Sequence, residues 1–140
     1  MKNIIIISHG DFSKGIKNSA EMIMGDSIKI KTFSLYPSES PDFIANEIEK
    51  LVKNNLNEEF LILADILGGS VYNACLRLVM YSNARIISGI NLGLLIETLL
   101  INDKEEDIDI ALEKAIDRAK EGIKLVNKKL LKDREDDEIW

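Results

Sequence analysis

Two kinds of apolar pattern alternate along the chain, and together they predict strands separated by helices. Unbroken runs such as IIII (4–7) and FLILA (60–64) are typical of strands buried on both faces of a sheet. Between such runs, apolar residues recur every three or four positions, which is typical of helices that bury one face. The predicted strands are residues 4–7, 28–35, 60–64 and 84–91, and the predicted helices are 13–24, 41–52, 70–79, 92–100 and 108–120.

This alternation predicts an α/β fold with an open, mainly parallel sheet, doubly wound so that helices cover both faces. We expect the strand order 2-1-3-4 in a single domain. The segment 122–131 is ambiguous: GIKLV alternates like a short strand, whereas IKLVNKKLL has the apolar spacing of a helix. Residues 128–140 are mostly charged, and we expect them to form a frayed C-terminal tail.

Composition and charge narrow the classes of function. The chain has 140 residues, a formal net charge of −6 and a pI near 4.9, which argues against nucleic acid or an anionic membrane as the main partner. Cys75 is the single cysteine, so an internal disulfide is excluded and a reducing compartment fits. The apolar runs are too short for a membrane span or a secretory leader, so we expect a cytoplasmic protein.

Polar residues follow two of the predicted strands. His9, the single histidine, follows the first strand, and Asp65 follows the third. Parallel sheets bind ligands at the carboxyl ends of their strands, and these two strands are neighbours in the expected order, so His9 should lie beside Asp65. A carboxylate bonded to one ring nitrogen leaves the other nitrogen free to take a proton, a metal or a phosphoryl group.

The GGS segment (68–70) suggests which of these groups the site takes. Gly68 and Gly69 allow backbone amides to approach a ligand, and Ser70 at a helix start offers donors to an anion. Together with His9 and Asp65, these residues predict a phosphate-handling site. Each part also has a structural interpretation: His9 as a satisfied strand-end residue, Asp65 as a helix cap, and 68–70 as an ordinary loop and N-cap.

Several rival sites are excluded by their motifs. Gly10-x4-Gly15 is followed by Ile16-Lys17, where a P-loop needs Lys-Ser/Thr. One histidine and one cysteine cannot form a zinc site, so we expect no metal and no cofactor. A two-component receiver would need an acidic pair after the first strand, where Ser8 and His9 stand.

Four segments, in order, carry a resemblance to a known family. They are IIIISHGDFSKGIKNSAEMIMG (4–25), LILADILGGSVYNA (61–74), ISGINLGLLIETL (87–99) and AKEGIKLV (119–126). These resemble the mannose-type IIA domains of the bacterial phosphoenolpyruvate-dependent sugar phosphotransferase system (PTS). The resemblance covers residues 1–127, which we therefore interpret as the EIIA domain, with 128–140 as the tail.

The resemblance implies a phosphotransferase that works through a phosphohistidine. His9 is similar to the histidine phosphorylated on Nε2, Asp65 to the carboxylate that orients its ring, and Ser70 to the serine that helps hold the phosphoryl oxygens. The implied donor is the phosphocarrier HPr and the implied acceptor a IIB domain, which serves the IIC and IID membrane proteins in sugar uptake. The resemblance also implies peripheral association with that permease complex. It further implies a homodimer that exchanges an antiparallel C-terminal strand, here within 122–126.

Two positions depart from the family pattern. Val71 and Gly93 stand where the family usually has proline, and we expect them to affect the rim of the site and the choice of partner more than its chemistry. Two alternatives remain open. Subunits of dihydroxyacetone kinase resemble this fold but usually carry M-G-S where this chain has G-G-S, which favours sugar transport. The other is a regulatory binding module that no longer transfers phosphate.

Overall fold

The fold is built on a four-stranded parallel sheet. The computed structural model describes residues 1–104 and 107–137. The sheet has the order β2-β1-β3-β4, and each neighbouring pair is parallel. Its strands are β1 (Asn3–His9), β2 (Ile30–Leu35), β3 (Phe60–Ala64) and β4 (Ala84–Ile87). The predicted α/β class and the order of these strands are confirmed.

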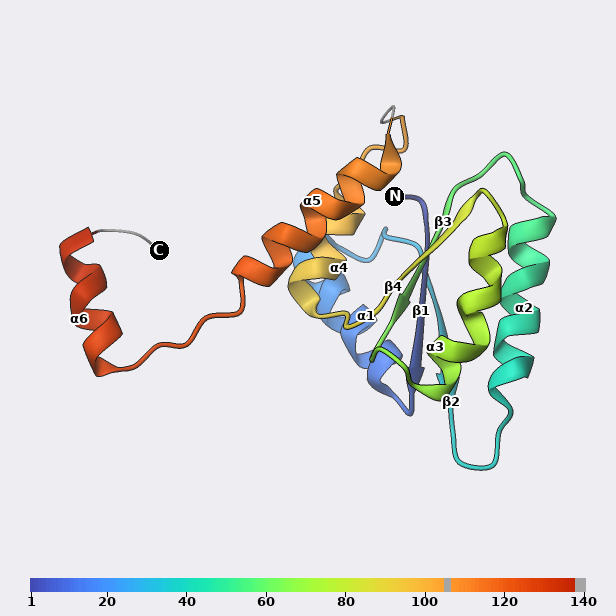
Figure 1. Ribbon diagram of the computed structural model, residues 1–140, viewed down its shortest axis with the longest axis horizontal. Helices are drawn as coiled ribbons and strands as arrows, with labels where there is room; N and C mark the ends of the chain where they lie inside the picture. The colour runs from blue at the N-terminus through green and yellow to red at the C-terminus, as the bar shows by residue number, and fades with distance from the viewer. Residues whose placement is uncertain (105–106, 138–140) are drawn as a thin grey trace.

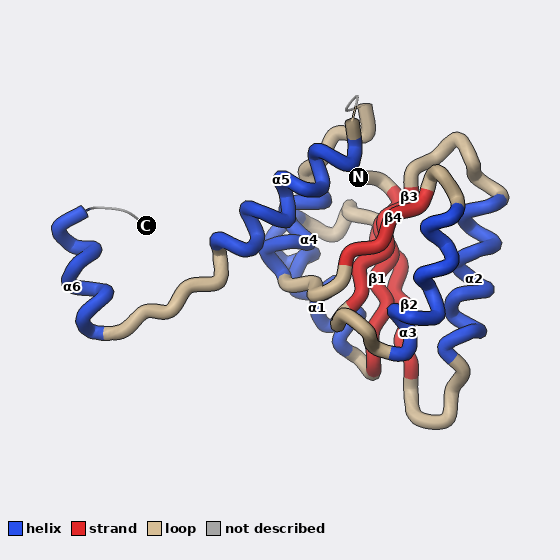
Figure 2. The backbone as a smooth tube through the Cα atoms, viewed as in Figure 1, coloured by secondary structure: helices blue, strands red, loops and turns tan. Residues whose placement is uncertain are grey.

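Helices cover both faces of this sheet, as Figures 1 and 2 show. One face packs against α1 (Phe12–Met24), α4 (Leu92–Leu99) and α5 (Ile108–Glu121), and the other against α2 (Pro41–Lys53), α3 (Ser70–Cys75) and the 3-10 helix η1 (Leu76–Met80). Alternate residues of each strand face opposite layers. The isoleucine run of β1 is therefore apolar throughout, because both of its faces are buried.

Two of the predicted elements end more than two residues from the predicted position. The fourth strand ends at Ile87 and not at residue 91, because Gly89 has a φ of 73° and turns the chain. Asn91 then caps α4, where its side chain accepts the N–H of Leu94 at 2.8 Å. The single helix predicted after the GGS segment is divided into α3 and η1.

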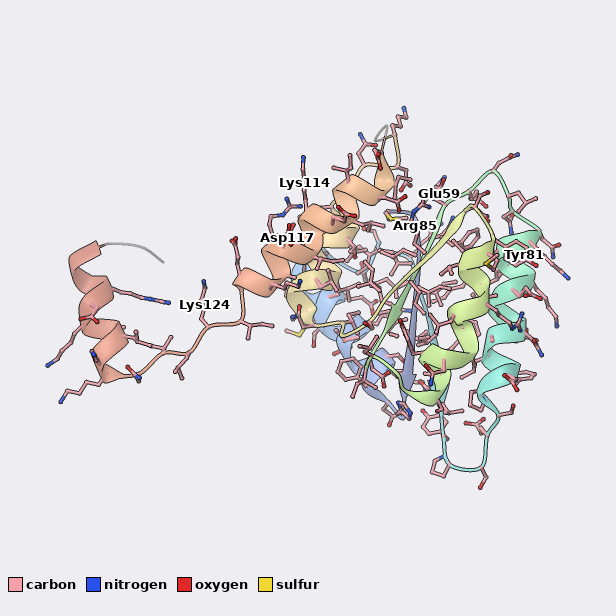
Figure 3. All side chains as sticks on the ribbon, viewed as in Figure 1. Glu59, Tyr81, Arg85, Lys114, Asp117 and Lys124 are labelled. Carbon is pink, nitrogen blue, oxygen red and sulfur yellow. The ribbon has the colours of Figure 1, made fainter. Side chains whose placement is uncertain are left out.

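The C-terminal part of the chain stands apart from the body of the fold, as Figure 1 shows. The prediction of a frayed tail is wrong for α6 (Lys128–Asp137), which begins where the Asn127 side chain accepts the N–H of Leu130 at 2.9 Å. Residues 138–140 of that predicted tail lie outside the described residues. The stretch 123–127 is neither helix nor strand, so the helical interpretation of it is wrong and the strand interpretation is not confirmed; only 128–131 of the ambiguous segment are helical, within α6. Figure 3 shows Lys124 on this connecting segment.

Two further contacts tie the layers together. Arg85 on β4 is bonded to Glu59 just before β3 and, at 2.5 Å, to Asp109 on α5. Figure 3 shows the Arg85 and Glu59 side chains on the sheet side of α5. The Met1 ammonium donates to the carbonyl of Ile101 at 2.6 Å, just beyond the end of α4. Throughout the described part of the chain, the helices are too short or too polar to cross a bilayer.

Candidate functional site

The sheet places His9 and Asp65 side by side at its carboxyl edge. β1 and β3 are paired up to Ile7 and Ala64, and each continues into one of the two polar residues. Nδ1 of His9 lies 2.9 Å from Oδ2 of Asp65. The same oxygen accepts the backbone N–H of His9 at 2.8 Å. The predicted neighbourhood of these two residues is confirmed.

Asp65 anchors the histidine and does not cap a helix. Its second oxygen, Oδ1, accepts the N–H of Ile66 at 2.8 Å, and the N-cap of α3 is Gly69. The interpretation of Asp65 as the cap of the following helix is therefore wrong. A carboxylate can only accept, so Nδ1 is the donor in this contact, and the neutral imidazole then has its lone pair on Nε2.

The Nε2 side of the ring faces solvent and the start of α3. The His9 side chain is 50% exposed, whereas that of Asp65 is 14% exposed. Nε2 lies 3.4 Å from Oγ of Ser70, at the outer limit of a hydrogen bond. The structure thus brings His9, Asp65 and Ser70 together. Among the described residues, Asp65 is the only ionisable side chain with a hydrogen bond to His9.

The two glycines of this segment are required for different reasons. Gly68 has a φ of 77°, a left-handed conformation that side chains other than glycine rarely adopt. Gly69 has an ordinary φ, but a Cβ there would lie 3.0 Å from Cε1 of His9 and 2.9 Å from Cγ2 of Ile66. Asn73 holds this turn, because its side-chain amide donates to the carbonyl of Gly68 at 3.0 Å. The spacing G-G-S-x-x-N in the sequence is the signal for that contact.

Two buried serines beside His9 were not predicted as part of the site. Ser8 and Ser13 are fully buried, and Oγ of Ser8 accepts the N–H of Ser13 at 2.8 Å. A serine at a strand end has no distinctive pattern by itself. Two serines five residues apart that bracket the single histidine are the signal that the sequence offers.

Exposed large apolar side chains stand on the segments that follow β1, β2 and β3, at the edge of the sheet where His9 lies. Phe12, Tyr36, Ile66 and Leu67 are 37–69% exposed. Tyr36 also joins two of these loops, because its hydroxyl donates to Asp11 and accepts from Lys14. We call these four residues the apolar collar. Scattered exposed apolar residues are ordinary, but several around one site are typical of a docking surface.

The two positions that depart from the family pattern lie in different surroundings. Val71 is fully buried in the core between the sheet and α2, so its side chain cannot line the rim of the site. Gly93 is exposed in the first turn of α4, and a Cβ there would meet only Oδ1 of Asn91, at 3.4 Å.

Comparison with known proteins places the chain in a family. Residues 3–116 match the family model EIIA-man, described as the PTS system fructose IIA component. The PTS system mannose-specific EIIAB component of Escherichia coli K12 is 28% identical over 128 residues, and the match covers 90% of this chain and 40% of that protein. The sorbose-specific EIIA component of Klebsiella pneumoniae is 33% identical over 98 residues, with coverage of 69% and 72%.

Solved structures agree with the sequence comparisons. The crystal structure of the PTS component EIIA from Streptococcus agalactiae is 31% identical, with a TM-score of 0.78 and coverage of 89% of this chain and 97% of that one. The chain spans about 40% of the length of the EIIAB relatives that it matches. On the family match and the agreement in fold, the chain belongs to the mannose/fructose/sorbose family of PTS EIIA components.

Proposed function

We propose that this chain is a phosphohistidine carrier of a sugar PTS, and that Nε2 of His9 carries the phosphoryl group. One observation supports this most strongly: Asp65 holds Nδ1 at 2.9 Å, while Nε2 is left exposed toward Ser70. A nitrogen with a fixed tautomer, a free lone pair and access to solvent is suited to nucleophilic attack on phosphorus.

The transfer step follows from these positions. The Nε2 lone pair of His9 attacks the phosphorus of phospho-HPr, and the bond from phosphorus to the donor nitrogen of HPr breaks. The electron pair of the broken bond stays with HPr. Nδ1 of His9 keeps its proton, so positive charge develops on the ring, where the carboxylate of Asp65 stabilises it. The same chemistry in reverse passes the phosphoryl group to a histidine of a IIB domain.

Uncharged donors would hold the phosphoryl oxygens. The Ser70 hydroxyl faces Nε2, and the amides of Gly68 and Ser70 lie in the same turn. Gly69 keeps that turn close to the ring, because it has no Cβ to press on Cε1. Hydrogen-bond donors placed in advance stabilise charge on a transferring group without reorganisation during the reaction.

The apolar collar would serve as the docking surface for HPr and IIB. Its side chains are exposed on the segments that follow the strands at the His9 edge of the sheet, so a partner that covers them would exclude water from the transferring phosphoryl group. The IIB domain would then pass the phosphoryl group on for sugar uptake through the IIC and IID membrane proteins. We place it in the cytoplasm, in peripheral association with that permease complex.

Labelling of the purified protein tests this function. The chain is incubated with phosphoenolpyruvate, its phosphotransferase and HPr, and the modified residue is identified by mass spectrometry. We expect one phosphoryl group on His9 that is lost in acid and survives in base. His9→Ala should abolish labelling and leave the fold intact. A stable phosphate on Ser8 or Ser70, with His9 unmodified, would contradict the proposal.

The same experiment separates the two alternatives. A regulatory module would bind partners but stay unlabelled by phospho-HPr, and a dihydroxyacetone kinase subunit would not pass its label to a IIB domain. The presence of His9, Asp65 and Ser70 in one cluster argues against a module that has lost transfer. Movement of the label from this chain to a IIB domain would support the carrier.

A further inference from the structure

The residue before the histidine makes two hydrogen bonds that close the loop after β1. Ser8 is fully buried, and its Oγ accepts the N–H of Ser13 at 2.8 Å and lies 3.2 Å from the carbonyl oxygen of Gly10. A carbonyl cannot donate, so the hydroxyl proton points to Gly10. One side chain therefore fixes residues on both sides of the turn that begins at His9.

Ser8 also replaces the missing helix cap. The N-cap residue of α1, Asp11, makes no side-chain cap, and the first N–H groups of a helix have no partner within it. Ser8 satisfies one of them, at Ser13. The Ser13 hydroxyl lies in turn 2.9 Å from that of Ser34, which is the register partner of Ser8 on β2. The three serines thus link β1, α1 and β2.

This network fixes the backbone of His9 at both ends. On one side, the His9 N–H donates to Asp65 at 2.8 Å. On the other, Gly10 has a φ of 55°, its N–H donates to Leu35 at 2.7 Å, and its carbonyl accepts from Ser8. The ring itself is half exposed and is held at Nδ1 by Asp65. Its direction toward a partner therefore depends on that bond and on the backbone that Ser8 fixes.

We propose that Ser8 is a positioning residue for phosphoryl transfer, whose hydroxyl holds the turn that aims the His9 ring. This rests on the proposed function of His9. Removal of the hydroxyl leaves the Ser13 N–H and the Gly10 carbonyl without that partner, so the turn relaxes and the ring shifts. Because a shift of about 1 Å at the reacting atom can slow a reaction on the order of 100-fold, the effect belongs in the transfer rate and not in the binding of the partner.

The test compares Ser8→Ala with Ser8→Thr, which keeps the hydroxyl, and with Ser27→Ala, an exposed serine beyond α1. We expect Ser8→Ala to lower the maximal rate of transfer from phospho-HPr on the order of 10- to 100-fold, with little change in the half-saturating concentration of phospho-HPr. Ser8→Thr should stay within about threefold of the native rate, and Ser27→Ala should match the native protein.

A spectroscopic measurement separates positioning from general stability and does not depend on transfer. His9 is the single histidine, so its ring nitrogens give unambiguous ¹⁵N signals. In the native protein and in Ser8→Thr, these should report a proton on Nδ1. In Ser8→Ala the shifted ring should bond less well to Asp65, so the signals should report a mixture of tautomers. If the native protein takes no label from phospho-HPr, the proposed function fails. The ring signals still show whether Ser8 holds the His9 ring in place.

Two results would overturn the role of Ser8: native transfer and native ring signals in Ser8→Ala, or a Ser8→Thr variant as slow as Ser8→Ala. If circular dichroism shows that Ser8→Ala does not fold, Ser8→Cys takes its place. The thiol occupies the same position but is a weaker donor and acceptor, so a loss of rate is again expected. A native rate in Ser8→Cys would overturn the proposal in the same way.

Discussion

A single carboxylate oxygen fixes both the position and the protonation of the reacting ring. Oδ2 of Asp65 accepts from the backbone N–H of His9 at 2.8 Å and from its Nδ1 at 2.9 Å. The backbone bond places the residue, and the ring bond selects the tautomer. Substitutions at Asp65 can therefore change the chemistry at Nε2 without direct contact with that atom.

Asp65→Asn should slow phosphoryl transfer by about 10³- to 10⁴-fold, with the fold retained. The amide can donate to Nδ1, which moves the ring proton to Nε2 and removes the lone pair that attacks phosphorus. The change is followed as the rate of label uptake from phospho-HPr, with circular dichroism to monitor folding. Asp26→Asn, at an exposed aspartate, is the matched control. If Asp65→Asn transfers at the native rate, Asp65 has only a structural role.

Gly69→Ala should reduce transfer at least about tenfold, because the new methyl group would lie within 3.0 Å of the His9 ring and displace it. The control is Gly15→Ala within α1, where a Cβ meets nothing within 4 Å. That change should leave transfer intact and raise the free energy of unfolding by up to about 1 kcal/mol. Equal transfer rates in the two variants would show that the approach of Gly69 to His9 is not needed.

Cys75 should react slowly with thiol reagents at neutral pH. Burial raises the pKa of its thiol to about 11, although the charge of Arg77 acts in the opposite direction. The thiolate is the reactive form, so at pH 8 about a hundredfold less of it is present than for a thiol with the ordinary pKa of 9.0. The rate with a disulfide reagent should rise about tenfold for each pH unit up to about 11. Fast reaction of the folded protein at pH 8 would contradict this assignment.

At the scale of elements, the strands were predictable because burial on both faces leaves a clear mark in the sequence. The runs at 4–7 and 60–64 lie within β1 and β3, and the polar residues after them share the carboxyl edge of the sheet. The ends of strands that are set by a local turn were harder to predict from the sequence. The strand over 84–91 looked longer than β4, because a left-handed conformation at Gly89 leaves no trace in apolar spacing.

The residues that hold the site in place were harder to predict than the residues that react. His9 and Asp65 stand out because each is a titratable residue at the end of a buried strand, at the edge where parallel sheets bind ligands. Ser8 and Ser13 act through hydrogen bonds that depend on a turn, and serine is common at turns of every kind. The helical form of α6 was missed because its residues are mostly charged and lack the apolar spacing of the other helices, and a cap such as that of Asn127 is a weak signal in the sequence.

At the scale of the whole molecule, two features are left without a partner in the part of the chain that the structure describes: the edge of the sheet at β4 and the apolar residues of the C-terminal segment. β4 is the last strand of the sheet, and a groove of about 460 Å³ runs beside it, lined by residues of β4, η1 and α5. An uncovered strand edge is normally paired or protected. The segment 123–127 is extended, and its apolar residues Ile123 and Leu125 are 73% and 74% exposed. We therefore expect this segment to pair antiparallel with β4 of a second copy.

This exchange predicts a closed homodimer, because a two-fold swap pairs the segment of each copy with β4 of the other and leaves no unpaired segment to recruit a further copy. Sedimentation equilibrium at micromolar concentration should give twice the chain mass of 15.8 kDa. Truncation after Glu121 removes the segment and should give a monomer that still takes label on His9. Truncation after Asn127 removes α6 alone and should leave the dimer intact, since the pairing residues remain. A native protein that sediments as a monomer, or a dimer that survives truncation after Glu121, would show that the segment does not form this strand.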